Sequence, residues 1–193
     1  LFQQTKDKRV INFLKQKGFE VQEFNQKKNK IENLVEIEIV KHDFYDSSIS
    51  IKTPDAKILN LNDCPLRDVE DIKKFRKKFG TFDVLLTQFS YAAWKGGKKG
   101  KIFRENAAKE KLADVYNQSK ILNCKKVIPF ASFVYFSNEL NFYMNDSINT
   151  PGRVYKYLTK NSAKPIIMKP GEKQILSELE QDKNSLEFWN NKY

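Results

Sequence analysis

The sequence predicts an α/β protein in which a sheet packs against helices. Strand-like segments come first along the chain and then alternate with helices, an order typical of α/β domains. Hydrophobic residues make up 40% of the 193 residues and aromatic residues 13%, which argues against a disordered chain and allows a sizeable core. No apolar run approaches the roughly 20 residues that a membrane-spanning helix needs.

The first elements are indicated by their hydrophobic spacing. Apolar residues at helical intervals over 6–17, followed by Gly18, predict a helix that stops there. Residues 19–24 are strand-like, and the polar stretch 25–30 is interpreted as a turn. Apolar and charged side chains alternate over 35–41, which predicts a strand with one buried and one solvated face.

Two further strands are expected over 48–52 and 57–61, joined by a turn at 53–55. Asp68 is placed to cap a helix over 69–79, which Gly80 ends. The remaining elements are a buried strand, a long connection, and then alternating helices and strands, over 82–89, 90–103, 104–123, 126–128, 150–158, 165–168 and 184–193. Connections as long as 90–103 are usually functional or disordered.

The chain is strongly basic. Lys and Arg total 35 and Asp and Glu total 24, so the formal net charge is +11. This surplus favours anionic partners without choosing among nucleic acid, nucleotides, sugar phosphates and lipid headgroups. The basic clusters at 73–78 and 95–101 also fit a solvated helix face and a solvated loop. The sequence contains no zinc finger, helix-turn-helix or ribonucleoprotein motif, which disfavours nucleic acid.

The chain has two cysteines, Cys64 and Cys124, which are too few for a disulfide framework. Reduced thiols in a cytoplasmic protein are the simpler interpretation. The first residue is Leu rather than Met, so we expect that an upstream segment is missing.

Two residues at predicted strand ends have the chemistry of metal ligands. His42 is the one histidine and follows the strand over 35–41, and Asp63 follows the strand over 57–61. Strand ends deliver binding residues in α/β sheets. A neutral imidazole and a carboxylate suit zinc, iron or manganese, although two ligands are too few to hold a metal alone. The alternatives are a hydrogen-bonded structural histidine and a carboxylate that caps a turn or helix.

The stretch 42–63, with the helix and strand after it, resembles the second half of the metallo-β-lactamase fold. In that family a lone His follows a strand. An Asp about twenty residues later, matched here by Asp63, ends the next-but-one strand and often bridges two metals. The resemblance is more specific to a branch that includes CMP-N-acetylneuraminate hydroxylase-like proteins. It spans roughly residues 10–190, and its similar segments are 59–65, 85–94, 129–146 and 169–171.

Two departures from the family pattern stand out. The family's Ile-Pro-x-His loop has Ala131 where the last His ligand would be. The motif His-x-His-x-Asp-His is absent, because the chain has one histidine, and it would lie upstream of residue 1. The resemblance therefore implies a single domain over 1–193 that is mainly the C-terminal half of an αββα sandwich. An upstream segment or a second chain would complete it.

The resemblance implies part of a metal-dependent hydrolase-like or oxygenase-like enzyme that acts on an anionic substrate, such as a nucleotide sugar or a phosphate ester. A divalent metal, zinc or iron, would be held by His42 and Asp63, and Asp63 would also be catalytic by holding the water or second metal. Three kinds of substrate contact are expected. Tyr91 and Trp94 would stack on a base or sugar, and Lys95 and Arg104 would bind a phosphate. Asn141 and Tyr143 would form hydrogen bonds to a sugar or amide.

The ordinary alternative is that these aromatic residues are partial core and that the loop lysines face solvent. Two other functions remain open for the whole chain. One is a degenerate, non-catalytic domain that binds an anionic ligand or a protein partner. The other is a basic nucleic-acid-binding protein.

Overall fold

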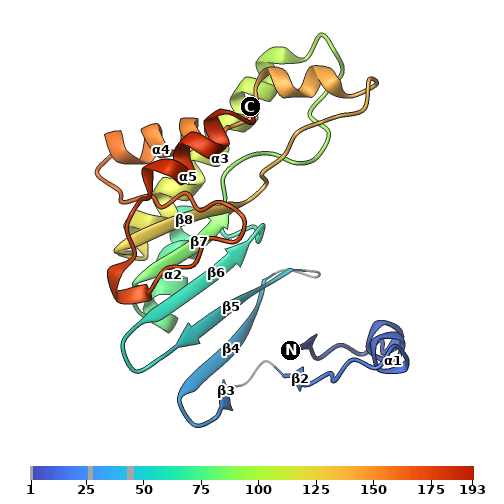
Figure 1. The fold of residues 1–193 in the computed structure, drawn as a ribbon, viewed down its shortest axis with the longest axis vertical. Coiled ribbons are helices and arrows are strands. Elements are labelled where there is room, and N and C mark those ends of the chain that lie inside the picture. The colour runs from blue at the N-terminus through green and yellow to red at the C-terminus, as the bar shows by residue number, and fades with distance from the viewer. Residues whose placement is uncertain (1, 26–27, 43–45) are drawn as a thin grey trace.

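The computed structural model describes residues 2–25, 28–42 and 46–193, and a six-stranded sheet forms its centre (Figure 1). The strands lie side by side in sequence order. They are β3 (Lys28–Ile31), β4 (Val35–His42), β5 (Asp46–Lys52), β6 (Lys57–Asn62), β7 (Val84–Gln88) and β8 (Lys126–Ala131). A separate two-stranded parallel sheet pairs β1 (Phe2–Gln3) with β2 (Glu23–Phe24).

The sheet changes its pairing at β6. Neighbours from β3 to β6 are antiparallel, whereas β6, β7 and β8 are parallel. Parallel neighbours need crossover connections, and helices α2 (Val69–Phe79) and α3 (Lys101–Ile121) provide them. The predicted α/β class is therefore confirmed, and so is the order of strands first and strand–helix alternation afterwards.

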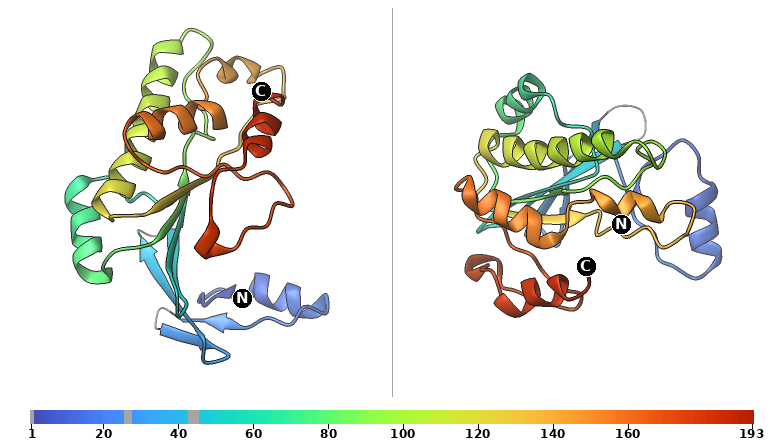
Figure 2. Two further views of the ribbon diagram at one scale, coloured as in Figure 1. Left: turned by 60° about the vertical axis from the view of Figure 1, so that its left-hand side comes forward. Right: turned by 90° about the horizontal axis from the view of Figure 1, so that it is seen from above.

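Helices α2 and α3 cover one face of the sheet (Figure 2). The main core lies there, where the fully buried Leu59 and Leu85 of the sheet pack with Ile72 of α2 and Val115 of α3. Helix α4 (Pro151–Lys160) extends this layer and packs against α3, and α5 (Lys183–Asn190) packs against α4. Asp68 caps α2 as predicted, because its side chain accepts hydrogen bonds from two backbone amides of the first turn.

The opposite face of the sheet is covered from both ends of the chain (Figure 2). Near the N-terminus, which contains α1 (Arg9–Gln16), Phe24 packs on Ile37 and Ile39 of β4. Near the C-terminus, the segment with the short helix η2 (Leu176–Glu178) packs on β7, where Leu179 forms a buried apolar cluster with Val84 and Ile166. Apart from β1 and β2, the described residues form one sheet with a layer of helices on one face, and that the chain is mainly one half of an αββα sandwich stays a prediction.

Four local predictions differ from the structure, the first being the strand expected over 19–24, which is limited to the two residues of β2. The polar stretch 25–30 is not a turn throughout, because Lys28–Ile31 forms the edge strand β3. Residues 165–168 do not form a full strand and make only a bridge from Pro165 to Val127. Helix α3 begins at Lys101, so the long connection is shorter than expected. Among the described residues, none of the helices combines the length and apolarity that crossing a membrane requires.

Candidate metal-ligand and anion-binding site

Strand direction brings the two predicted ligands to one edge of the sheet. Both β4 and β6 pair antiparallel with β5, so they run in the same direction, and β7 and β8 run parallel to β6. The carboxyl ends of these four strands therefore lie together, and we call this the carboxyl edge. His42 ends β4 and Asp63 directly follows β6, so both predicted residues lie at the carboxyl edge.

His42 is a half-buried histidine beneath α2. Its Nε2 lies 2.7 Å from Oγ of Ser48 on β5, and its ring stacks on Phe75 of α2 at a centroid distance of 5.6 Å. Burial lowers the pKa of His42, and the nearby Asp46 carboxylate opposes this effect only in part. The imidazole is therefore neutral near pH 7, the form that binds metals, but its Nε2 is engaged by Ser48.

Asp63 is exposed and lines a cavity of about 320 Å³ at the carboxyl edge. The register of β6 against β7 shifts between Asn60 and Asn62, and Asn62 has a positive φ of 51°. Such irregularities redirect the side chains that follow. Asn62 also donates a 2.7 Å hydrogen bond from its Nδ2 to Oδ1 of Asp63. The carboxylate, which is part of the cavity lining, is therefore oriented by its neighbour.

Three cationic side chains line the same cavity as Asp63. They are Arg67, Lys95 and Lys111, which come from the segment before α2, the loop after β7 and helix α3. The Arg67 guanidinium forms an ion pair with Asp114 at 3.6 Å. One carboxylate on the lining faces three cations, so the cavity is suited to an anion.

Lys111 is the most deeply placed of these cations. Burial lowers its pKa to about 8, and the positive charges of Arg67 and Lys95 contribute in the same direction. Its ammonium group donates a hydrogen bond to Oε1 of Gln88 at the end of β7. Gln88 in turn donates from Nε2 to the Ser132 hydroxyl at 2.8 Å. These two hydrogen bonds hold the half-desolvated amine of Lys111 in the cavity, where an anion would interact with it more strongly than in bulk water.

The described residues do not form a complete metal site. Over residues 2–25, 28–42 and 46–193, no three His, Cys, Asp or Glu side chains come together as a possible ligand set. Strands β4 and β6 are two strand spacings apart, about 10 Å, so His42 and Asp63 could share an ion only by leaning toward β5. Burial raises the pKa of the adjacent Cys64 to about 12, which keeps it a thiol rather than a ligand thiolate.

The loop after β7 (residues 89–100, the β7–α3 loop) carries three of the predicted substrate contacts, and they lie in different surroundings. Tyr91 is only 1% exposed, and its hydroxyl donates a 2.6 Å hydrogen bond to the Met144 carbonyl. Trp94 is 69% exposed and projects from the loop. Lys95 lines the cavity, and so does Tyr91. Of the three, Lys95 has the surroundings expected of an anion contact.

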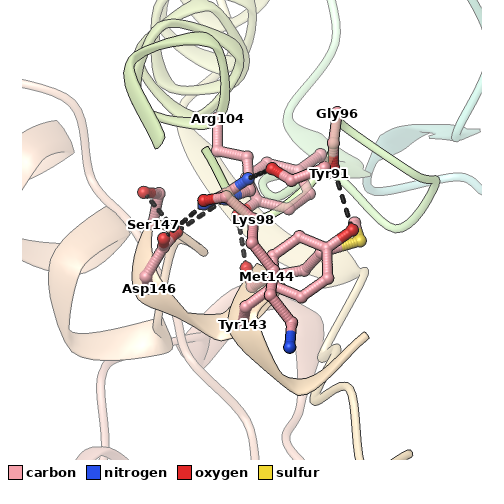
Figure 3. Close-up of polar contacts among 9 residues, drawn as sticks. Tyr91, Gly96, Lys98, Arg104, Tyr143, Met144, Asp146 and Ser147 are labelled. Atoms are coloured by element: carbon pink, nitrogen blue, oxygen red, sulfur yellow. Dashed lines mark hydrogen bonds and ion pairs between the residues drawn. The ribbon is translucent and has the colours of Figure 1, made fainter. Parts of the chain in front are cut away.

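Arg104 contradicts the prediction of a direct phosphate contact. Its side chain has no exposed surface and forms a bidentate ion pair with Asp146, at 2.8 Å from Nε and 2.6 Å from Nη2 (Figure 3). Nη1 also donates to the Gly97 carbonyl at 2.7 Å. The guanidinium lies 4.9 Å from the ring centre of Tyr143. With its donors directed to protein acceptors and no exposed surface of its own, Arg104 joins parts of the protein to one another instead of facing a substrate.

The last two predicted sugar contacts lie in and beside the short helix η1 (Phe142–Asp146). The Tyr143 hydroxyl donates to the Gly96 carbonyl at 3.0 Å, so it ties η1 to the β7–α3 loop. Asn141 is half-buried, and its Oδ1 meets no hydrogen-bond donor among the described residues. Neither residue lines the cavity that contains Asp63.

Sequence reasoning missed Arg67, Gln88 and Lys111. A signal existed for Lys111, which lies three residues after Ala108 and four before Val115 on the buried stripe of α3. A lysine in such a stripe is unusual, because its charge must be desolvated. Arg67 gave no such signal, since it lies in an irregular segment between β6 and α2.

No protein-family model matches this sequence, and neither does the sequence of any curated protein. Among solved structures, the chain is similar to CmlA, a diiron β-hydroxylase from Streptomyces venezuelae, with a TM-score of 0.49 and 11% identity. The match covers 80% of this chain and 34% of CmlA, so the chain spans about a third of that protein's length.

The chain is also similar to a structure from Thermotoga maritima described as a proposed Zn-dependent hydrolase of the metallo-β-lactamase superfamily. That match has a TM-score of 0.43 and 16% identity, and it covers 83% of this chain and 70% of the other. These similarities concern the arrangement of strands and helices, and they transfer neither a metal nor a reaction to this chain.

Proposed function

We propose that this chain binds a small anionic molecule at the carboxyl edge, as part of a metal-dependent hydrolase-like or oxygenase-like enzyme of the metallo-β-lactamase type. One observation carries the anion-binding part, namely the convergence of Arg67, Lys95 and Lys111 on a single cavity. A nucleotide sugar or a phosphate ester has the matching chemistry, because a guanidinium binds phosphate oxygens in a bidentate manner and an ammonium neutralises their charge.

The proposal is tested by calorimetric titration with inorganic phosphate and pyrophosphate. We expect the wild type to bind pyrophosphate, and Arg67→Gln and Lys111→Met each to weaken binding by about tenfold, the typical effect of losing one hydrogen bond to a charged group. Lys109→Met is the matched control, because Lys109 is exposed on the same helix and does not line the cavity. A wild type that does not bind, or an equal loss in the control, would contradict the proposal.

The metal ligands are proposed as a second part of the same site. Two observations support His42 and Asp63, namely their shared edge and the neutral imidazole. Because the described residues supply too few ligands, the remaining ones would come from a second chain or from a segment upstream of residue 1, such as the one the family resemblance implies. Zinc and iron both suit a histidine–carboxylate pair. The resemblance to the CMP-N-acetylneuraminate hydroxylase-like branch stays a prediction.

The metal proposal is tested with the upstream segment or second chain that supplies the remaining ligands present, by equilibrium dialysis against Zn²⁺ or, without oxygen, Fe²⁺, followed by elemental analysis. We expect His42→Ala and Asp63→Ala each to lower the affinity of the chain for the ion by about tenfold or more, with unchanged circular dichroism. Asp55→Ala, which changes an exposed carboxylate in the β5–β6 turn, is the control. If the wild type holds neither ion, or if both variants keep full metal content, the assignment is wrong.

Two alternatives remain distinguishable by simple measurements. A chain that binds pyrophosphate but no transition metal would be a non-catalytic anion-binding domain. Steeply salt-dependent binding of duplex DNA would instead favour a nucleic-acid-binding protein.

Because neither Cys64 nor Cys124 is in a disulfide, we propose that the protein acts in the cytoplasm.

A further inference from the structure

One wall of the anion-binding cavity has no regular secondary structure. The β7–α3 loop contributes Tyr91, Ala92, Ala93 and Lys95 to the lining. Backbone hydrogen bonds to regular elements hold the ends of this loop, where the Phe89 amide donates to the Ala131 carbonyl of β8 and the Gly100 carbonyl accepts from the Arg104 amide of α3. Ala92, Ala93 and Trp94 are exposed, so their side chains provide little anchoring. The position of the Lys95 amine in the cavity therefore depends on contacts made elsewhere along the loop.

Arg104 provides two of these contacts. From the first turn of α3 it donates to the Gly97 carbonyl at 2.7 Å and to the Lys98 carbonyl at 3.3 Å (Figure 3). The same guanidinium is held from the other side by both oxygens of Asp146. Arg104 thus joins three segments, namely the loop, α3 and η1.

Two tyrosines run alongside this connection. The Tyr143 hydroxyl donates to the Gly96 carbonyl, and the Tyr91 hydroxyl donates to the Met144 carbonyl. Both bonds link the loop to η1, the helix that also carries Asp146. The end of the loop packs tightly against Arg104. A Cβ added at Gly100 would lie 3.2 Å from the Gly97 carbonyl oxygen and 3.6 Å from Nη1 of Arg104. The loop is therefore fastened at 96–98, directly after Lys95.

We propose that Arg104 is a positioning residue of the anion-binding cavity, which it serves by fixing the β7–α3 loop so that Lys95 faces the ligand. This inference rests on the proposed function of the cavity. Arg104 does not line the cavity, so its effect on binding is indirect, and its bonds to the Gly97 and Lys98 carbonyls hold the segment next to Lys95. A lysine cannot replace it, because the interaction uses the planar fork of the guanidinium to bind Asp146 and two carbonyls at once.

The test measures pyrophosphate binding and loop mobility in the same proteins. The chain has two tryptophans, Trp94 in the loop and Trp189, so Trp189→Phe leaves Trp94 as the reporter. In that background we expect Arg104→Lys and Arg104→Gln each to weaken pyrophosphate binding about tenfold. We also expect both to lower the fluorescence anisotropy of Trp94, while the far-UV circular dichroism stays unchanged. Lys109→Gln is the control, since it removes an exposed charge from the same helix.

A double-substitution cycle separates positioning from general destabilisation. If Arg104 acts through Lys95, then Arg104→Gln should cause little further loss in a Lys95→Met background. Tyr143→Phe removes only the hydroxyl that holds Gly96, and we expect a smaller loss of binding in the same direction. This variant keeps the proposal falsifiable if the Arg104 variants do not fold.

The possible outcomes are distinct. Additive losses for Arg104→Gln and Lys95→Met, or retained affinity in Arg104→Lys, would overturn the positioning role while the proposed function stands. No binding of pyrophosphate by the wild type would overturn the proposed function and, with it, the role of Arg104 in binding.

Discussion

Lys111 is the residue in which binding and stability conflict most directly. Its ammonium group is half-buried in the cavity, beside the positive charges of Arg67 and Lys95. Burial lowers its pKa from 10.5 to about 8, so the charged form is disfavoured in the folded protein relative to the unfolded chain. The same desolvation strengthens its attraction for an incoming anion. The residue is therefore suited to a ligand rather than to the unliganded fold.

Lys111→Met should consequently stabilise the unliganded protein at pH 7, by about 1 kcal/mol after allowance for solvent screening. Between pH 8 and 10.5 the unfolded chain keeps the Lys111 proton while the folded protein loses it, so the wild type gains stability as pH rises. The advantage of the variant should shrink over that interval. Urea unfolding at pH 7 and pH 9.5 measures both values, with Lys109→Met as the control. An advantage that does not change with pH would contradict the assignment.

At the scale of single elements, α2 illustrates how local sequence determines an element that supports the site. Asp68 accepts hydrogen bonds from the amides of Glu70 and Asp71 at 2.9 and 3.2 Å. Acidic residues occupy the first turn and basic residues the last, which suits the helix dipole. Phe75 of this helix then stacks on His42. The cap therefore stabilises the element that covers a proposed metal ligand.

Asp68→Ala should lower the free energy of unfolding by about 1 kcal/mol, because two amides at the start of α2 lose their acceptor. Thermal unfolding followed by circular dichroism measures the change. Asp68→Asn keeps an acceptor at the same position and should have little effect. Equal losses in the two variants would show that the charge of Asp68, rather than its capping geometry, is responsible.

For the whole molecule, the spacing of apolar and capping residues predicted those helices and strands whose formation depends on neighbouring residues in the sequence. The alternation over 35–41 and the capped stripe over 69–79 correspond closely to β4 and α2. The edge strand β3 was missed because its sequence is polar. It exists through its pairing with β4, where Lys28 lies opposite Glu38 and Lys30 opposite Glu36. Such cross-strand partners are not visible in a short window of sequence.

The candidate site was predictable to the same extent. Strand direction alone places His42 and Asp63 at one edge, and that part of the prediction agrees with the structure. The group of three cations that lines the cavity was not predictable, because Arg67, Lys95 and Lys111 come from three separate segments that converge only after folding. Arg104 was misassigned because its charge indicated a ligand, whereas its ion-pair partner Asp146 lies 42 residues away in the chain.

The change from antiparallel to parallel pairing at β6 also has a consequence for assembly during synthesis. Strands β4, β5 and β6 follow one another closely along the chain, so they can associate while the rest of the chain is still being made. The β7–β8 pair has to wait until α3 has emerged from the ribosome. Nascent chains would thus expose an incomplete sheet edge at β6 for a time, and the pocket with its three cations would be among the last features to mature.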